Sequence, residues 1–443
     1  MMRKSRMISH LLGTVGLALA AALPGAVSAD ETCNSPYMGN LIKGQEDFLY
    51  VWALGVAGLG DGEDKLVTID VNPKSKTYGK VLNHVSVGER GEAHHMGFTD
   101  DRRYLWAGGL DSNKIYVFDV AADPANPKLV KTIADLGDRS GYLGPHTFYA
   151  LPGRMLIGTL SNTKDKGGVT GMALYNNKGD FIIKYDLPTT NGGDGYGYDI
   201  AINPAKNALL TSSFTGWNNY MRPLGELVKD QEAMKKFGNT MVLWDLKAMR
   251  PKQVFNVPGA PLEIRWSLNA GDNWAITASA LTSKLWLVKQ DKKTRQWQAK
   301  EVGTIGDPAK IPLPVDISIR RDSKGLWVNT FMDGKTRYFD ISDPEHPKQT
   351  YEKVTGKQVN MISQSWDGKR VYIGSSLLSK WDKGGADDEQ FVRAFTWNGK
   401  ELKPTFEVDF TKEQLGRAHH MKFGSRALKV AFETAAPPAL AQR

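Results

Sequence analysis

From about Phe48 onward, the chain alternates short apolar, β-branched segments with turns rich in Gly, Pro, Asn and Asp. One segment recurs, an apolar stretch that closes with an acid and a turn. Its clear copies are 65–71, 114–120, 240–246 and 336–341, and its weaker copies are 171–175, 284–288 and 391–395. Segments of this kind are typical of β-strands. Seven copies at intervals of roughly 40 to 70 residues have the period of a four-stranded propeller blade.

A second repeated element precedes six of these copies and also closes the chain. Its copies begin at His95, His146, Asp199, Glu263, Asp316, Met361 and His420, and each is followed at the same offset by another strand residue. The first strand of a propeller blade lines the central channel. We therefore expect these seven positions to surround one mouth of that channel.

The ends of the repeat predict how the ring closes. Little chain follows His420, whereas residues 48–88 hold three strands with no inner strand before them. We predict an all-β, seven-bladed β-propeller over residues 48–443, in which the C-terminal strand completes the N-terminal blade and removes both sheet edges. Residues 30–47 form a leading arm. Residues 222–237, rich in helix formers, predict a helical insertion at the rim.

The first 29 residues have the pattern of a cleaved secretory signal peptide. Three basic residues are followed by the apolar run Leu11–Leu23 and by the small-residue sequence Val27-Ser28-Ala29. The run is too short for a membrane span, so we expect no membrane insertion of the mature chain. The sequence thus predicts a periplasmic protein.

Composition narrows the class of partner. Of the 443 residues, 41% are hydrophobic and 24% are charged, as in a soluble globular protein. The single cysteine, Cys33, excludes an internal disulfide and a cysteine-rich metal site. Removing residues 1–29 lowers the net charge from +9 to about +6, and the basic residues are scattered among acids. We expect no nucleic-acid partner, and a homo-oligomer remains compatible with the sequence.

Five histidines gather at the predicted channel mouth. Because the last blade adjoins the first, His420, His95 and His146 come from three consecutive blades, with His94 and His419 beside them in sequence. Such clustering predicts a metal site. Because neighbouring strand residues point to opposite faces, each doublet is expected to offer one ligand and one supporting residue. The alternative is that these histidines bind only buried water and carbonyls.

The residue types at the predicted channel mouth favour copper as the metal, and three acids are expected opposite the histidines. Three imidazoles with a thioether nearby suit copper better than calcium or magnesium, with zinc left open. Met361 is the weaker candidate ligand because methionine more often packs. Asp199, Glu263 and Asp316 fill the opposite arc as candidate acid–base residues. Aspartates at strand starts also cap turns, and Arg265 shares a face with Glu263 and favours an ion pair there.

Several motifs together resemble one family over nearly the whole mature chain. They are 33–38, 66–73, 91–95, 144–147, 197–199, 261–265, 339–344, 379–383 and 418–419. These segments resemble the selenium-binding protein family, and with an export signal they look most like its bacterial periplasmic branch, the copper-dependent methanethiol oxidases.

The resemblance implies oxidation of methanethiol by O2 and water to formaldehyde, hydrogen sulfide and hydrogen peroxide at a histidine-held copper. Two positions depart from the family. The strand 51–54 lacks the cysteine of the animal branch, so selenium binding is not expected, and His420 is not always histidine, which makes His419 the safer ligand.

One hypothesis combines the predicted channel site with the chemistry that the family resemblance implies. Copper would bind the substrate as thiolate while Glu263 or Asp316 accepts a proton from the methyl group, with Asp199 as the third candidate. Two other classes remain open: a calcium-dependent, lactonase-like propeller hydrolase and a non-catalytic binding scaffold.

Overall fold

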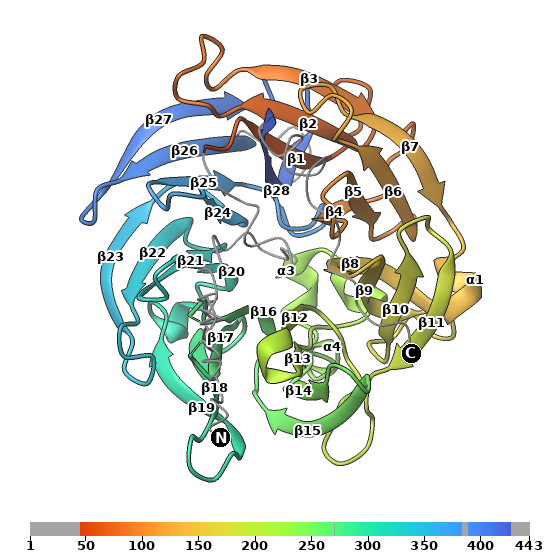
Figure 1. Ribbon diagram of the computed structural model, residues 1–443, viewed down its shortest axis with the longest axis vertical. Helices are drawn as coiled ribbons and strands as arrows, with labels where there is room; N and C mark the ends of the chain where they lie inside the picture. The colour runs from red at the N-terminus through yellow and green to blue at the C-terminus, as the bar shows by residue number, and fades with distance from the viewer. Residues whose placement is uncertain (1–44, 270, 383–388, 427–443) are drawn as a thin grey trace, which may run out of the picture.

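Seven antiparallel sheets of four strands each form a ring around a central channel (Figure 1). This computed structural model describes residues 45–269, 271–382 and 389–426. The predicted seven-bladed β-propeller is confirmed. The proposed signal peptide 1–29 and most of the arm 30–47 lie outside the described residues.

The inner strands of six blades follow one another in chain order, and each begins a sheet that runs outward. The blades are β4 (Ala93–Phe98), β5 (Tyr104–Gly109), β6 (Lys114–Asp119), β7 (Lys128–Ile133); β8 (Tyr142–Leu151), β9 (Arg154–Asn162), β10 (Gly171–Asn176), β11 (Phe181–Asp186); β12 (Ile200–Asn203), β13 (Ala208–Thr211), β14 (Thr240–Asp245), β15 (Arg250–Asn256); β16 (Pro261–Trp266), β17 (Trp274–Ser279), β18 (Lys284–Gln290), β19 (Trp297–Thr304); β20 (Pro314–Ile319), β21 (Gly325–Thr330), β22 (Lys335–Asp340), β23 (Lys348–Val354); β24 (Ile362–Gln364), β25 (Arg370–Gly374), β26 (Phe391–Trp397), β27 (Leu402–Asp409).

The seventh blade joins the two ends of the chain. Its inner strand is β28 (Arg417–Gly424), which pairs antiparallel with β1 (Phe48–Leu54), followed outward by β2 (Lys65–Asp70) and β3 (Val81–Ser86). The ladder runs from Phe48 opposite Gly424 to Leu54 opposite Arg417. This is the closure that the sequence predicted, and it leaves no unpaired inner strand in the ring.

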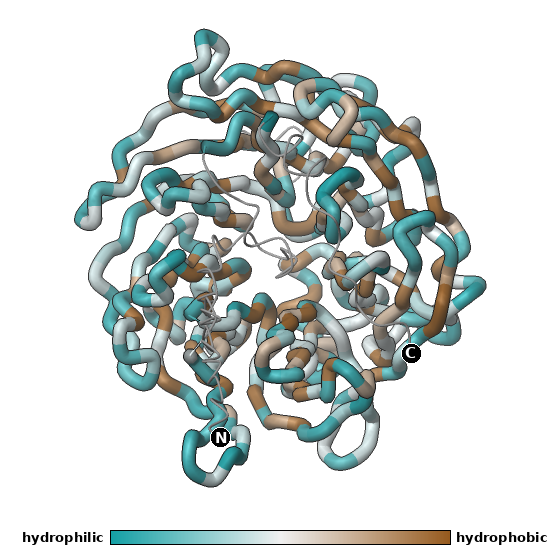
Figure 2. Tube along the Cα trace, in the orientation of Figure 1, coloured by the Kyte–Doolittle hydropathy of each residue, from teal (hydrophilic) through white to brown (hydrophobic). Residues whose placement is uncertain are grey.

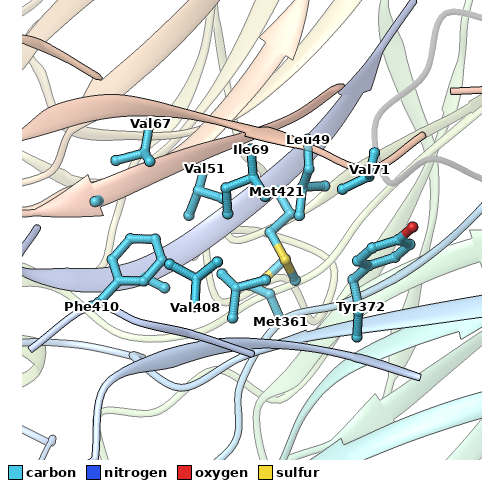
Figure 3. Packing of buried hydrophobic residues seen from close by; sticks show 14 of the residues in the cluster. Leu49, Val51, Val67, Ile69, Val71, Met361, Tyr372, Val408, Phe410 and Met421 are labelled. Carbon is cyan, nitrogen blue, oxygen red and sulfur yellow. The ribbon is translucent and has the colours of Figure 1, made fainter. Parts of the chain in front are cut away.

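Apolar side chains fill the spaces between neighbouring blades. In one of these layers Met361 lies with Leu49, Val51 and Met421, all of them buried (Figure 3). Met361 therefore has the packing role that methionine usually has. The loops that project at the periphery are mainly hydrophilic (Figure 2), so the apolar surface is used chiefly to hold blade against blade.

A helical insertion separates β13 from β14. It consists of α2 (Trp217–Tyr220), α3 (Leu224–Leu227) and α4 (Gln231–Met234), so helical turns begin somewhat before the predicted 222–237. The remaining short helices are α1 (Leu136–Ser140), η1 (Pro204–Lys206) and η2 (Pro308–Lys310). In Figure 1, α3 lies toward the centre of the ring. Buried insertion residues pack with residues of the inner strands and their flanking loops, so the insertion covers one mouth of the channel.

No helix within the described ranges is both long and apolar enough to span a membrane.

The inner strands share a local irregularity near their starts. The pairing register shifts between Ala93 and Met96 in β4, between Pro145 and Phe148 in β8, and between Pro261 and Ile264 in β16. Similar shifts occur at the start of β20 and where β1 pairs with β28. A β-bulge releases residues from strict alternation and re-aims their side chains. The bulges of β4, β8 and β16 contain His94, His95, His146 and Glu263, and the bulge of β28 contains His419.

Candidate functional site

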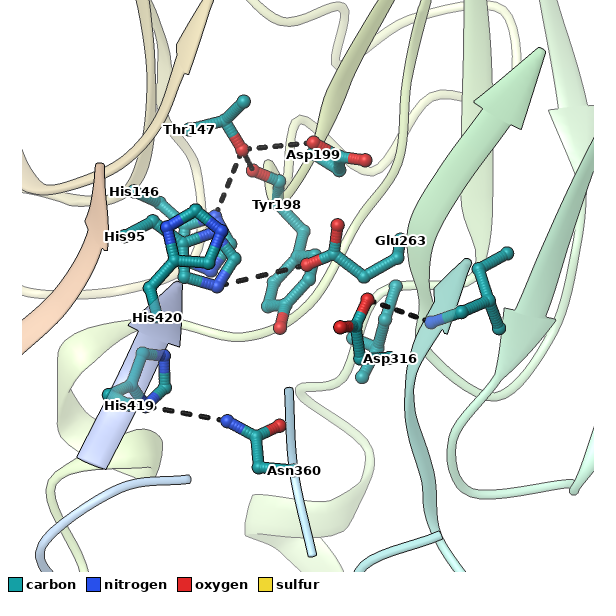
Figure 4. A network of polar contacts seen from close by, with 12 residues as sticks. His95, His146, Thr147, Tyr198, Asp199, Glu263, Asp316, Asn360, His419 and His420 are labelled. Carbon is teal, nitrogen blue, oxygen red and sulfur yellow. Dashed lines mark hydrogen bonds and ion pairs between the residues drawn. The ribbon is translucent and has the colours of Figure 1, made fainter. Parts of the chain in front are cut away.

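Five imidazole rings are packed together where β4, β8 and β28 begin. The ring centroids are 3.9 Å apart for His94 and His419, 4.0 Å for His95 and His146, and 4.5 Å for His95 and His420. All five side chains are buried. Figure 4 shows four of them on one side of the channel, facing the carboxylates across it. The structure thus brings together the histidines that the sequence placed in one arc.

Each doublet is predicted to offer one ligand and one supporting residue, and the structure places both rings of each doublet in the cluster. The His94 and His95 rings stack at 4.8 Å with an angle of 12° between their planes. In the ladder between β1 and β28, Trp52 pairs with His420 and Ala53 pairs with Ala418. His419 is skipped and therefore lies at the bulge. His94, His95 and His419 lie within bulges, where side-chain alternation is interrupted, so they reach the cluster together with His420.

The cluster has nitrogen atoms ready to bind a metal. Among the described residues, five buried ring nitrogens have no hydrogen-bond partner: Nδ1 of His94, Nδ1 of His95, and Nε2 of His146, His419 and His420. Potential ligand atoms of His94, His95 and His146 lie within 4.8 Å of one another. Buried polar atoms without a partner are costly, so an ion that accepts the lone pairs of those nitrogens that carry no hydrogen would offset part of that cost.

Burial keeps the imidazoles neutral, which is the form that binds metals. Desolvation, reinforced by the neighbouring rings, holds the pKa of His94, His95 and His146 well below the usual range. Burial also lowers the pKa of His419 to about 3. A neutral ring has one free lone pair, so the donor set fits a soft or borderline transition metal.

Hydrogen bonds orient two of the rings differently. Nδ1 of His146 lies 3.1 Å from Oγ1 of Thr147, whose hydroxyl can donate to the Asp199 carboxylate at 3.1 Å. His146 can then carry its hydrogen on Nδ1 and present the Nε2 lone pair. Nδ1 of His420 instead accepts the Met96 N–H at 3.0 Å, so its neutral ring carries the hydrogen on Nε2. This arrangement favours His146 over His420 as a ligand.

The opposite arc is built around one guanidinium. Nη1 of Arg265 lies 3.0 Å from Oε2 of Glu263 and 3.3 Å from Oδ2 of Asp199, and Nη2 lies 3.0 Å from Oδ1 of Asp316. All four side chains are buried. The ion pair that the sequence suggested between Glu263 and Arg265 is therefore present, and it includes both aspartates.

The two aspartates also link neighbouring blades. Asp199 accepts the N–H of Ile264, at 2.8 Å, from the following inner strand. Asp316 accepts the N–H of Ile362, at 2.7 Å, from the inner strand after its own. These bonds give both carboxylates a structural role, close to the capping alternative that the sequence left open.

Glu263 differs from the aspartates in having one carboxylate oxygen directed at the histidines. Within the described part of the chain, Oε1 of Glu263 has no hydrogen-bond partner, and it lies 3.8 Å from Nε2 of His95 (Figure 4). Burial and the nearby Asp199 raise the pKa of the Glu263 carboxyl well above its usual range, only partly offset by Arg265. Among the three predicted acids, the geometry favours Glu263 for proton transfer.

Three further residues complete the site and were not singled out from the sequence. The Tyr198 ring packs on His146 at 4.1 Å between centroids. Thr147 connects His146 to Asp199, and the Asn360 amide nitrogen lies 3.4 Å from Nδ1 of His419. Thr147 and Tyr198 each adjoin a predicted site residue, so sequence adjacency was the available signal.

A propeller that holds neutral buried imidazoles beside a buried carboxylate has the features of an enzyme whose site could hold a metal. The chain belongs to the 56 kDa selenium-binding protein family, whose model matches residues 27–426.

Relatives match almost the full length. A protein named methanethiol oxidase from Hyphomicrobium sp is 66% identical, over 95% of this chain and 96% of its own length. Another protein of the same name, from Ruegeria pomeroyi, is 58% identical over 93% of this chain and 97% of its own length. The crystal structure of a hypothetical selenium-binding protein from Sulfolobus tokodaii aligns with a TM-score of 0.76 at 26% identity, covering 88% of this chain and 96% of that one.

Proposed function

We propose that the protein is a methanethiol oxidase that converts methanethiol, O2 and water to formaldehyde, hydrogen sulfide and hydrogen peroxide. The observation that carries the proposal is the 66% identity, over nearly the whole chain, to a protein of that name. In this reaction methanethiol loses two electrons and O2 gains two, so the products balance without a further reductant.

We propose copper as the metal, held by His146 together with His94 and His95, with His419 and His420 beside them. The open ring nitrogens support this assignment, because imidazole lone pairs suit copper and zinc, and the redox reaction favours copper. Calcium prefers six to eight oxygen ligands. Here the carboxylate oxygens of Asp199 and Asp316 accept hydrogen bonds from Arg265 and from backbone N–H groups. The calcium-dependent hydrolase is therefore the less favoured function.

Copper, when bound, would stabilise the substrate as its thiolate and supply a redox centre. The residues of the chain supply the remaining functions. Glu263 accepts a proton at Oε1, and its raised pKa makes it a stronger base than an exposed glutamate. Arg265 holds the other oxygen at 3.0 Å and so fixes the direction of the carboxylate. Thr147 and Asp199 orient the His146 ring.

We also propose that the reaction takes place in the periplasm. The support is the pattern of residues 1–29, with its basic start, apolar run and small-residue cleavage sequence.

Metal content and thiol consumption, measured on the same preparations, test the proposal. We expect copper in the purified protein, its loss in His146→Ala, and O2-dependent consumption of methanethiol that disappears with the copper. His346→Ala is the matched control, since this histidine is 72% exposed and pairs with Asp343 at the surface. Calcium in place of copper, or thiol consumption that needs no O2, would contradict the proposal.

A further inference from the structure

A small, partly enclosed cavity adjoins the imidazole cluster. His94 forms one wall, and the other walls are apolar or aromatic, among them Tyr198, Leu262, Val315 and Leu377. The cavity volume is about 10 Å³, roughly the space that one water-sized molecule needs. An apolar space of this size beside a polar cluster fits a small alkyl group.

The bulge that contains Glu263 and the bulge next to Asp316 also form this wall. Leu262 and Glu263 lie in the register shift between Pro261 and Ile264, and Val315 lies in the shift before Asp316. Each bulge therefore presents an apolar side chain to the cavity next to a carboxylate. The apolar cavity therefore lies beside a carboxylate, so a ligand with two heavy atoms can contact both the cavity wall and the carboxylate.

The roof of the cavity comes from two loops that meet above the channel. Leu377, Leu378 and Trp381 follow β25, and Phe214 belongs to the connection that leads into the helical insertion. The Phe214 and Trp381 ring centroids are 5.8 Å apart, and the Leu224 N–H donates to the Lys380 carbonyl at 3.3 Å. The two loops thus support each other.

A buried acid fastens the same roof to the first blades. Glu92, just before β4, accepts the Ser379 N–H at 2.7 Å and the Ser379 hydroxyl at 2.5 Å. Asp382 accepts the Ser376 hydroxyl at 2.6 Å and the Leu377 N–H at 2.8 Å. These bonds fix the backbone on both sides of Leu377 and Leu378, so the cavity has a defined size.

We propose that this cavity receives the alkyl group of the thiol substrate and that Leu377 limits the length of that group. The inference rests on the proposed function. The sulfur would lie toward the imidazoles and the methyl group toward Leu262 and Val315. A longer chain would meet the roof, and a hydroxyl on the chain would meet mostly apolar walls, which is costly for a polar group.

Leu377→Ala tests the size limit, with Leu227→Ala as the matched control. Leu227 belongs to the same apolar cluster and is fully buried, but it does not line the cavity. We expect Leu377→Ala to raise the ratio of kcat/KM for propane-1-thiol over methanethiol by at least about tenfold, because each methylene accepted by an apolar pocket changes this ratio by ~10-fold or more. Leu227→Ala should leave the ratio unchanged.

A binding measurement on metal-free protein gives a readout independent of turnover. Propane-1-thiol should raise the Tm of Leu377→Ala and leave the Tm of Leu227→Ala unchanged. If Leu377→Ala does not fold, Ala280→Val replaces it: this variant fills the cavity, and the KM for methanethiol should rise. Methanethiol oxidation with an unchanged thiol ratio in Leu377→Ala, or an unchanged KM in Ala280→Val, would overturn the cavity assignment alone. Absence of thiol oxidation in the wild-type protein would overturn the proposed function instead.

Discussion

Nε2 of His95 lies 3.8 Å from Oε1 of Glu263, and both side chains are only 1% exposed. This contact joins the imidazole cluster to the carboxylates that surround Arg265. Arg265 holds the second oxygen of Glu263, so a proton accepted at Oε1 would lie next to the imidazoles.

Glu263→Gln should lower kcat for methanethiol by about 100-fold or more, because the amide cannot accept the proton. Copper content and Tm should change little, since the amide oxygen can still accept from Arg265. Asp316→Asn should instead lower the Tm, because this carboxylate joins two blades through the Ile362 N–H. Wild-type turnover in Glu263→Gln would exclude this residue as the base.

Thr147→Val should weaken copper binding by about 10- to 100-fold, the usual cost of losing a residue that orients a ligand. Valine keeps the shape but removes the hydroxyl that links His146 to Asp199. The measurement is a competition titration with a copper chelator. Thr159→Val serves as the control, since this buried hydroxyl contacts Thr170 and the Gly171 carbonyl in the same blade. Equal copper affinity in the two variants would contradict the orienting role.

Arg265→Met should destabilise the protein by about 3–5 kcal/mol, because it leaves three buried carboxylates without their shared guanidinium. Arg393→Met is the comparison, since Arg393 pairs with Glu389 and Glu407 nearer the surface, where such pairs contribute about 1 kcal/mol or less. Urea unfolding of both variants gives the two free energies. If Arg265→Met loses no more unfolding free energy than Arg393→Met, the three buried carboxylates do not depend on the Arg265 guanidinium.

Asp382→Asn should remove part of the pH dependence of stability. Burial raises the pKa of Asp382 to about 7, partly offset by Arg417, whereas an unfolded aspartate titrates near pH ~4. The folded state therefore binds this proton more tightly. Its contribution to stability is complete below about pH 4 and is lost as the pH rises through about 7.

The check is urea unfolding at pH 5 and pH 8. The wild-type protein should lose more stability than Asp382→Asn between these two values. Asp291→Asn is the control, because backbone N–H donors lower the pKa of that exposed carboxyl and it does not titrate in this range. A larger loss of stability in Asp382→Asn than in the wild type would show that folding does not raise the pKa of Asp382.

The fold was predictable because each blade repeats the same local pattern. Strand patterning and turn residues are local properties, so the seven copies could be aligned and the missing inner strand assigned to the C-terminal segment. The order of the blades then placed His95, His146 and His420 side by side. The structure confirms that placement.

The details of the site were less accessible because they depend on pairing between strands. A bulge is defined by register against a partner strand, so the doublet His94-His95 gave no local sign that both rings face the channel. The hydrogen bond from Ile362 to Asp316 links segments 46 residues apart. The cavity likewise takes walls from several blades and the roof, which no local pattern encodes.

Ring closure by β28 determines when the five histidines come together. This strand, the last one described, pairs with β1, the first, and it supplies His419 and His420. A chain still lacking residue 417 onward contains only His94, His95 and His146 of the five, and its β1 has no inner neighbour. Closing so long a loop is slow and occurs late in folding. The five histidines therefore come together only when β28 docks on β1, so a metal that needs all of them would bind no earlier than ring closure.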